Sequence, residues 1–399
     1  MIIIRENLKD MAMDIATSFS VLNNSHDAIV DAINKLDEKI APPSLLLLYF
    51  SEDYDYDVLQ LTLTKYYPNT PFLACSSCQG FMTEDGYING QGIALWAIND
   101  IVGAYGTSIV SSNGSIFNIA RQAILKAINN SGRLGESPTL ILLHATPGNE
   151  EEVIRGIEDV VGKNITIIGG SAADDHVNNK WKIFNQEQQT QQGIGIAVFY
   201  PNCEISFSFH SGYAATSYSA IATKVQGREI IELDHQPAAD VYQKWIQQRF
   251  EANSSIINES SLHPLGRLVG EIHDLPYFKL AHPLMVTKTN GLKMFASIIE
   301  GERLYLMTGT DERLITRAGR VVTSTNGIEL NPIGGLTIYC AGCMLKVQKR
   351  MEEVALFVKI AMHDKPFVCP FTFGEQGQFV TGENAHGNLM ISAVVFHRD

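Results

Sequence analysis

The sequence is poor in basic residues and in long apolar runs. It has 30 lysines and arginines against 43 aspartates and glutamates, which gives a formal net charge of −13. Binding to nucleic acid needs a local basic stripe, yet the densest basic stretch, residues 346–350, runs directly into Met351, Glu352 and Glu353. No apolar run approaches the roughly 18 residues of a membrane span. We therefore expect small molecules or proteins as partners, and neither nucleic acid nor a membrane.

The first residues lack the features of a secretory signal. Met1 to Ile4 are apolar, but Arg5 and Glu6 follow at once, and a basic region with an apolar core is missing. We expect the protein to stay in the cytoplasm. Its six cysteines are then expected as thiols, metal ligands or redox groups rather than as structural disulfides.

Motifs of common enzymes are missing as well. The sequence has no Walker phosphate loop, no Gly-x-Gly-x-x-Gly after a strand and no His-Glu-x-x-His. Ser76, Ser77 and Ser171 do not lie in a Gly-x-Ser-x-Gly elbow. No spacing pairs Cys340 with a histidine base. These absences predict that the protein is not an enzyme.

A strand–helix–strand pattern occurs three times in the chain. The two apolar runs of each copy are 45–50 and 71–77, then 139–144 and 165–171, then 336–340 and 367–373. A further apolar strand closes each copy, at 92–98, 193–199 and 389–396. Apolar strands separated by helices predict an α/β fold. We expect two halves, built from these repeated units, with mixed sheets covered by helices.

The second strand of each copy ends in small or polar residues. In α/β sheets, ligands bind at such strand ends, and three equivalent loops favour a site over simple turn chemistry. The candidate ligand-binding residues are Ser76, Ser77, Gly169, Gly170, Ser171, Asp174, Asp175, Glu375 and Gln376.

Four of these side chains are suited to a cation. Asp174, Asp175, Glu375 and Gln376 would hold an ammonium group or a metal ion. An alternative for Asp174 and Asp175 is a helix cap or an Asx-turn.

The chain resembles the FIST domain family at these loops. In the first half, the resemblance rests on the segments 169–175, 193–198, 210–212 and 232–234, with 237–238 and Tyr242. In the second half, it rests on 282–284, 300–302, 339–343, 371–377 and 384–388. The segments occur in the family's order over about residues 25 to 397. The resemblance implies an N-terminal extension at 1–24, a FIST N-like domain at 25–235 and a FIST C-like domain at 236–399.

The resemblance implies a sensor of small ligands that acts through a separate partner protein. One branch of the family consists of stand-alone proteins of about this length that bind haem, sense nitric oxide and regulate histidine kinases or cyclic-di-GMP enzymes. The alternative within the family is a sensor of an amino acid or another metabolite without haem. Neither branch determines the oligomeric state, and a homo-oligomer is compatible with both.

Three histidines are candidates for a haem ligand, because histidine is the commonest proximal ligand of haem. His210 follows an apolar strand, His386 lies in a glycine-flanked loop, and His176 stands beside two aspartates. No Cys-x-x-Cys-His motif is present, which excludes covalent attachment.

Two Cys-x-x-Cys pairs give a third kind of candidate site. They are Cys75 with Cys78 and Cys340 with Cys343. If both pairs met in space, four thiolates would bind zinc or an iron–sulfur cluster, and either pair alone could be a redox centre. The alternative is two unrelated pairs of small buried thiols.

Overall fold

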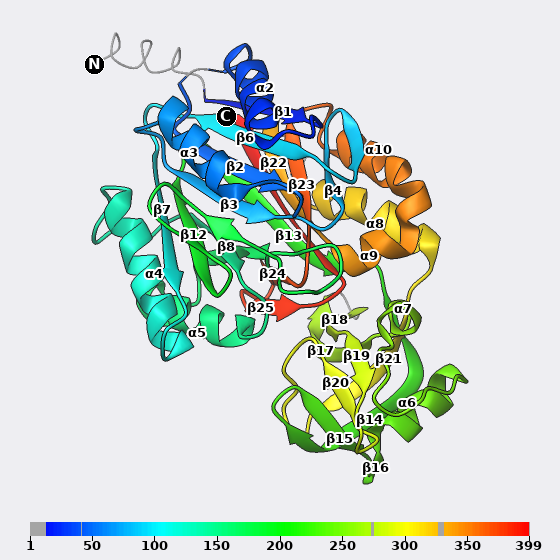
Figure 1. Ribbon diagram of the computed structural model, residues 1–399. Coiled ribbons are helices and arrows are strands. Elements are labelled where there is room, and N and C mark those ends of the chain that lie inside the picture. Colours follow the sequence, from blue (N-terminus) through cyan, green and yellow to red (C-terminus); the bar gives the residue numbers. More distant parts are fainter. Residues whose placement is uncertain (1–12, 41, 273–274, 326–330, 399) are drawn as a thin grey trace.

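The computed structural model describes residues 13–40, 42–272, 275–325 and 331–398. These residues form three six-stranded sheets and one eight-stranded sheet. The three smaller sheets and their helices form one body, and the eight-stranded sheet projects from it as a second body, drawn in green and yellow in Figure 1.

The first six-stranded sheet is built mainly from the first repeat. Its elements in chain order are β1 (Asp14–Ser20), α2 (Ser25–Asp37), β2 (Leu45–Phe50), α3 (Tyr56–Tyr66), β3 (Phe72–Ser76) and β6 (Ile93–Asn99). The strand β2 lies parallel to β3 and antiparallel to β6. All six residues of β2 are buried, because both faces of the sheet are covered. A strand in that position is apolar throughout rather than at alternate positions.

The other two repeats fold in the same way. The second contains β7 (Ala104–Ser111), α4 (Ile116–Asn130), β8 (Leu140–Ala145), α5 (Glu150–Val161), β9 (Thr166–Gly170) and β12 (Gly193–Tyr200). The third contains β13 (Glu204–Ser211), α8 (Asp311–Thr323), β22 (Asn331–Cys340), α9 (Ala341–Val347), α10 (Met351–Ala361), β23 (Phe367–Thr372) and β26 (Met390–Arg398). A short 3-10 helix, Gln348–Arg350, separates α9 from α10. The three repeats are called modules 1, 2 and 3 below.

Each module contributes a β-hairpin to the sheet of another module. The hairpin β4 (Gly80–Thr83) with β5 (Gly86–Asn89) leaves module 1 and pairs with β23. The hairpin β10 (Ile183–Phe184) with β11 (Gln189–Thr190) leaves module 2 and pairs with β3. The hairpin β24 (Glu375–Gln378) with β25 (Asn384–Gly387) leaves module 3 and pairs with β9. This cyclic exchange joins the modules into one core with approximate threefold symmetry.

The apolar interior is shared among the modules. One buried cluster contains Leu47 of β2, Leu142 of β8 and Leu336 of β22. Trp96 of β6 packs on Phe396 of β26, with 5.6 Å between the ring centroids. Because the sheets share these side chains, the modules are parts of one folded unit rather than separate domains.

The eight-stranded sheet is an insertion in module 3, between β13 and α8. Its elements are β14 (Ala214–Gln226), β15 (Glu229–Leu233), β16 (Gln236–Pro237), α6 (Ala238–Ile246), α7 (Ile257–Ser260), β17 (Leu265–Ile272), β18 (Leu275–Ala281), β19 (Pro283–Val286), β20 (Leu292–Met294) and β21 (Arg303–Thr308). It has an apolar core of its own, which includes Leu233, Tyr242 and Leu304. In modules 1 and 2, the corresponding strand reaches its helix after four residues. We call residues 214–308 the inserted domain.

The predicted α/β class with mixed sheets and covering helices is confirmed. The repeats are arranged as a core of three modules carrying an inserted domain. No helix in the described ranges combines the length and the apolar character needed to cross a bilayer.

Candidate functional site

The three strand-end loops meet at the centre of the core. Equivalent backbone hydrogen bonds connect them in a ring: Cys78 N–H to Phe371 O at 3.0 Å, Ala173 N–H to Ser76 O at 3.1 Å, and Phe373 N–H to Ser171 O at 3.0 Å. Each module therefore donates one bond to another module and accepts one. The threefold repeat in the sequence thus becomes a junction of three loops in space.

The second loop has two adjacent glycines, because neighbouring atoms leave no room for a β-carbon at either position. Gly169 has a φ of +151°, and a β-carbon on it would collide with the carbonyl oxygen of Leu143. A β-carbon on Gly170 would collide with the side chain of Thr372, in module 3. These two predicted ligand-binding residues are fully explained by strand and loop contacts.

The three predicted serines are buried and hydrogen-bonded within the protein. The Oγ of Ser76 accepts the N–H of Lys182 at 2.9 Å, and the Oγ of Ser77 accepts the N–H of Phe371 at 2.8 Å. The Oγ of Ser171 donates to Oε1 of Glu150 at 2.9 Å. Ser76 and Ser77 fix the loop junction, whereas Ser171 leads to a buried charged cluster described below.

The two predicted aspartates hold the loop after β9 in its conformation. The carboxylate of Asp174 accepts the N–H groups of His176 at 3.3 Å, of Asn178 at 2.8 Å and of Lys180 at 2.8 Å. The carboxylate of Asp175 accepts the N–H of Gln79 at 2.8 Å. The turn-forming alternative therefore describes Asp174, and Asp175 connects this loop to the first one.

Glu375 is fully buried at the start of β24. Its carboxyl group accepts Oγ1–H of Thr372 at 3.0 Å and the N–H of Met390 at 3.1 Å. Burial, reinforced by the nearby Cys340, raises the pKa of Glu375 well above its ordinary value. Burial therefore disfavours the ionised form of Glu375 that would pair with an ammonium group.

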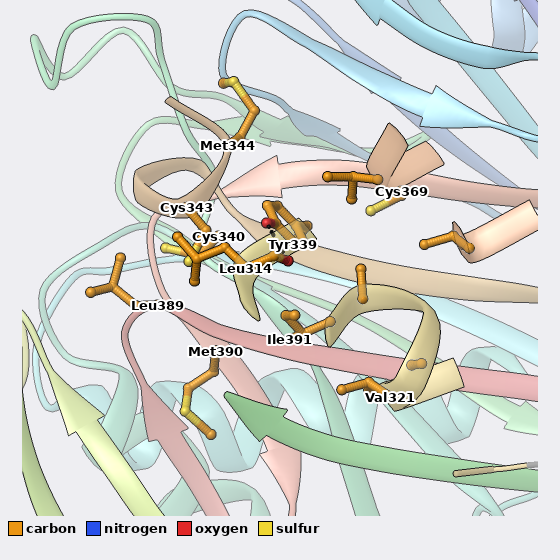
Figure 2. Packing of buried hydrophobic residues seen from close by; sticks show 14 of the residues in the cluster. Leu314, Val321, Tyr339, Cys340, Cys343, Met344, Cys369, Leu389, Met390 and Ile391 are labelled. Carbon is orange, nitrogen blue, oxygen red and sulfur yellow. Dashed lines mark hydrogen bonds between the residues drawn. The ribbon is translucent and has the colours of Figure 1, made fainter. Parts of the chain in front are cut away.

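The two Cys-x-x-Cys pairs do not assemble a four-thiolate site. Cys75 lies in the cluster shared by the sheets, whereas Cys78 packs in a different cluster with Cys340 and Cys343. Cys340 and Cys343 lie next to each other beside Tyr339 and Leu389 (Figure 2). Within the described ranges, no group of three or more histidine, cysteine, aspartate or glutamate side chains is placed to hold a metal ion.

Burial also disfavours the thiolate form that a metal would need. It raises the pKa of Cys78 and of Cys340 above the ordinary value of a thiol. The geometry therefore agrees with the alternative of small buried thiols.

A small cavity lies between the core and the inserted domain. Its volume is about 60 Å³. Its walls are formed by Val177, Ile257, His282, Phe295, Cys340, Ala341, Gly342, Leu345, Phe373 and Asn388. The core contributes Phe373 from the loop junction and the first turns of α9, and the inserted domain contributes Phe295 and His282. The lining is almost entirely apolar, so the cavity suits an apolar group or a small ligand with a polar end.

A charged cluster adjoins this cavity across the same interface. The Nη2 of Arg228, in the inserted domain, donates to Glu150 and to Glu151 at the start of α5, at 2.7 Å each. The Nη1 of Arg228 donates to the carbonyl oxygen of Phe295, a cavity residue, at 2.6 Å. Burial opposes ionisation of Glu151, but His386 and Arg228 outweigh it and lower the pKa of Glu151 to about 2.

Three further side chains of this cluster are buried and have polar atoms without a hydrogen-bond partner among the described residues. Arg267 of β17 leaves Nε and Nη2 without a partner among the described residues, Gln376 of β24 leaves Oε1, and His386 of β25 leaves Nε2. Sequence reasoning singled out Gln376 and His386 but missed both arginines. It also left Glu150 and Glu151 out of the candidate site, because contacts between distant segments leave no local signal.

The described residues do not fit haem. His176 is exposed, and Nδ1 of His210 accepts the N–H of Ser211 at 2.8 Å. Neither His176, His210 nor His386 lines the cavity. His282 does, but its Nε2 is bonded to the carbonyl oxygen of Ile257 at 3.0 Å. A cavity of about 60 Å³ is far smaller than the roughly 300–1,000 Å³ of sites for drug-sized ligands, so a haem macrocycle has no room there.

Comparison with curated proteins gives one partial match. An uncharacterised protein of Methanocaldococcus jannaschii is 28% identical over 145 residues, which cover 36% of this chain and 26% of that protein. The matched part thus spans about a quarter of the relative's length.

Two solved structures are similar over nearly the whole chain. One is a cyanuric acid hydrolase described as an "evolutionary innovation by structural concatenation", at 7% identity and a TM-score of 0.39, covering 96% of this chain and 99% of that one. The other is a cyanuric acid hydrolase from A. caulinodans, at 8% identity and a TM-score of 0.39, covering 97% and 100%.

The titles of these structures correct one expectation from the sequence. Both proteins are enzymes, so the absence of familiar enzyme motifs does not support the prediction that this chain is not an enzyme. The physical reason is that catalytic groups are defined by geometry and arise from many sequence patterns. At this TM-score, the likeness assigns no activity to this chain.

Family models cover most of the chain. The FIST N domain matches residues 44–236, and the FIST C domain matches residues 238–378. The border between them falls between β16 and α6, inside the inserted domain. With both domains matched in order, this chain belongs to the FIST family, whose domains are sensory modules of signal transduction that bind small ligands.

Proposed function

We propose that this protein is a metabolite sensor that holds its ligand between the three-module core and the inserted domain and signals to a separate protein. The observation that carries the proposal is the cavity whose walls come from both bodies, with Phe373 and Cys340 on one side and Phe295 and His282 on the other. A ligand there contacts both bodies at once. Its binding free energy is therefore coupled to their relative position.

The size of the cavity supports a closed arrangement. At about 60 Å³, it is well below the roughly 300–1,000 Å³ of sites for drug-sized ligands. Only a very small ligand fits without movement, and a larger one requires the inserted domain to shift away from the core. A ligand that binds one arrangement ten times more tightly than the other shifts the free-energy difference between the two arrangements by about 1.4 kcal/mol.

The wall of the cavity offers a route to a partner. The helix α9 contributes Ala341, Gly342 and Leu345 to the wall and leads through the short 3-10 helix into α10. On its outer side, α10 exposes Leu356 and Ile360. Neighbouring apolar side chains on a surface are typical of protein contacts. A histidine kinase or a cyclic-di-GMP enzyme is the partner class that the family resemblance implies.

Haem-based sensing of nitric oxide is not part of the proposal. The candidate histidines lie apart from the cavity, and the cavity is too small for the cofactor. The proposal is instead a FIST sensor that binds a small metabolite directly.

Filling the cavity tests the proposed site. The variant Ala341→Leu places a larger side chain in the cavity, and Ala355→Leu makes the same change at a buried position of α10 outside it. Both variants carry a similar overpacking cost of about 1–3 kcal/mol. A metabolite that raises the melting temperature of the natural protein should lose this effect only in Ala341→Leu. An equal effect in both variants would place the ligand elsewhere.

A further inference from the structure

Arg267 is a buried cation with an unused hydrogen-bonding edge. The residue is 7% exposed, and its Nη1 donates to the carbonyl oxygen of Ser297 at 2.8 Å. Its Nε and Nη2 have no partner among the described residues. These two N–H groups lie on one edge of the planar guanidinium and point in parallel. This edge matches the two oxygens of a carboxylate.

His386 offers a third unused donor on the opposite side of the interface. Its Nδ1 accepts the Nε2–H of Gln376 at 3.3 Å. Because Nδ1 accepts this hydrogen bond, the ring hydrogen lies on the other nitrogen, Nε2. Burial lowers the pKa of His386, and Glu150 and Glu151 oppose this effect. This Nε2–H is buried and has no partner among the described residues. Leaving a buried donor unpaired is unfavourable, and a ligand acceptor would remove this cost.

The surrounding charges single out Arg267 as the cation that lacks a direct counter-ion. Arg228 is engaged by Glu150 and Glu151 at 2.7 Å each. Glu302, Glu151 and Glu383 act on Arg267 only from a distance, and no carboxylate forms an ion pair with it in the described part of the chain. Arg228, Arg267, Glu150 and Glu151 together are close to neutral. A single negative charge is therefore tolerated far better than the double charge of a phosphate.

Two short segments link the donors to the wall of the proposed ligand cavity. The segment 295–297 connects them, because Phe295 lines the cavity and the carbonyl oxygen of Ser297 bonds Arg267. On the core side, Phe373 lines the cavity, and the next residue, Gly374, lies against the ring of His386. A ligand can thus place an apolar part in the cavity and an acidic end at the donors.

We propose that Arg267 and His386 bind the carboxylate of a small organic acid, with Oε1 of Gln376 accepting a hydrogen bond from a hydroxyl or amino group beside that carboxylate. This proposal rests on the proposed ligand-sensing function and names the chemical class of the ligand. The carboxylate bridges β17 of the inserted domain and β25 of the core, so its arrival favours closure of the interface.

The test uses three small probes at equal ionic strength, balanced with chloride. Glycolate carries the carboxylate and a hydroxyl group, acetate carries only the carboxylate, and acetamide has the same shape without the charge. For the natural protein, we expect glycolate to raise the melting temperature by several degrees, acetate to raise it less, and acetamide to have no effect.

The variant Arg267→Met removes the donors and keeps a long apolar side chain. It should fold, because replacing an unpaired buried charge by an apolar group is often neutral or stabilising, and it should lose the response to glycolate and acetate. The matched control is Arg317→Met, which removes another partly buried guanidinium, on α8. The control should keep the full response. A second variant, Gln376→Leu, should remove the difference between glycolate and acetate.

The outcomes separate this inference from the function on which it rests. A glycolate response that is unchanged in Arg267→Met would overturn the carboxylate site, and so would a natural protein that responds no more to glycolate than to chloride. If Ala341→Leu still abolishes the response to some other metabolite, the sensor stands and only the ligand class is wrong. If no metabolite response depends on either residue, both proposals fail.

Discussion

The Nδ1–H of His144 donates to the carbonyl oxygen of Gly170 at 2.8 Å, at the ends of β8 and β9. The Nε2 of the same ring lies 3.0 Å from the hydroxyl group of Tyr49, in β2, and accepts its hydrogen. One buried imidazole therefore links modules 1 and 2 beside the loop junction. Both of its nitrogens are satisfied only while the ring is neutral.

This arrangement predicts a loss of stability in acid. Burial lowers the pKa of His144 to about 4. Between pH 6.5 and pH 4, the unfolded chain binds a proton at this ring and the folded chain does not, so the free energy of unfolding falls as the pH falls. The full effect of one such histidine is about 3 kcal/mol at pH 4. Urea unfolding at several pH values measures it.

The variant His144→Asn isolates this contribution. It should be less stable than the natural protein at pH 7.5, because buried partners lose hydrogen bonds worth about 1–3 kcal/mol, but its stability should fall less steeply between pH 6.5 and pH 4. His26→Asn changes an exposed histidine and should leave the slope as it is. The same steep slope in His144→Asn would show that the ring titrates normally in the folded protein.

Arg228 should matter far more for stability than an arginine on the surface. Its guanidinium is mostly buried and bonds two carboxylates and a carbonyl oxygen. Removing one partner from a buried ion pair costs about 3–5 kcal/mol. We expect a loss of this size for Arg228→Met in urea unfolding. Arg121→Met breaks only an exposed pair with Asp159, and its loss should stay below about 1 kcal/mol.

The six thiols should differ sharply in their reactivity. None of the six cysteines is in a disulfide, and Cys203 is partly exposed, whereas the other five are buried. Burial keeps thiols such as Cys75 and Cys340 in their protonated, unreactive form by raising the pKa of each. A thiol reagent should therefore modify one cysteine quickly and five only on unfolding. The variant Cys203→Ser should lose the fast phase; rapid modification of Cys340 would contradict this account.

Haemin provides a test of the cofactor argument. Because no candidate histidine lines the cavity and the cavity is small, titration of the purified protein with haemin should give no sharp Soret band of a histidine-ligated haem. A stoichiometric Soret band that disappears in His386→Ala or His210→Ala would restore the haem-based sensor.

Much of the core could be predicted from periodicity and repetition. The apolar run at 45–50 is a strand with the same bounds, and the run at 139–144 is displaced by one residue in β8. Asn149 precedes helix α5, although its side chain makes no capping hydrogen bond. Fully buried strands and amphipathic helices leave strong local patterns, and equal spacing in two repeats indicates equivalent positions in space.

The candidate site could be predicted from the sequence only in part. The loops converge because the modules repeat, and this could be inferred from the sequence. The charged interface could not, because Arg228 and Glu150 are 78 positions apart and Arg267 lies on a strand with no distinctive motif. The position of the inserted domain decides which polar groups face each other, and that position depends on packing between whole bodies rather than on local sequence.

The most direct test of the central claim is a crystal of the full chain held under xenon pressure. Xenon enters apolar cavities of this size without any assumption about the natural ligand. We predict an anomalous density peak between Phe373 and Cys340 of the core and Phe295 of the inserted domain, which weakens in Ala341→Leu. Xenon found only at other positions, with Phe295 packed directly on Cys340, would contradict a ligand seat between the two bodies.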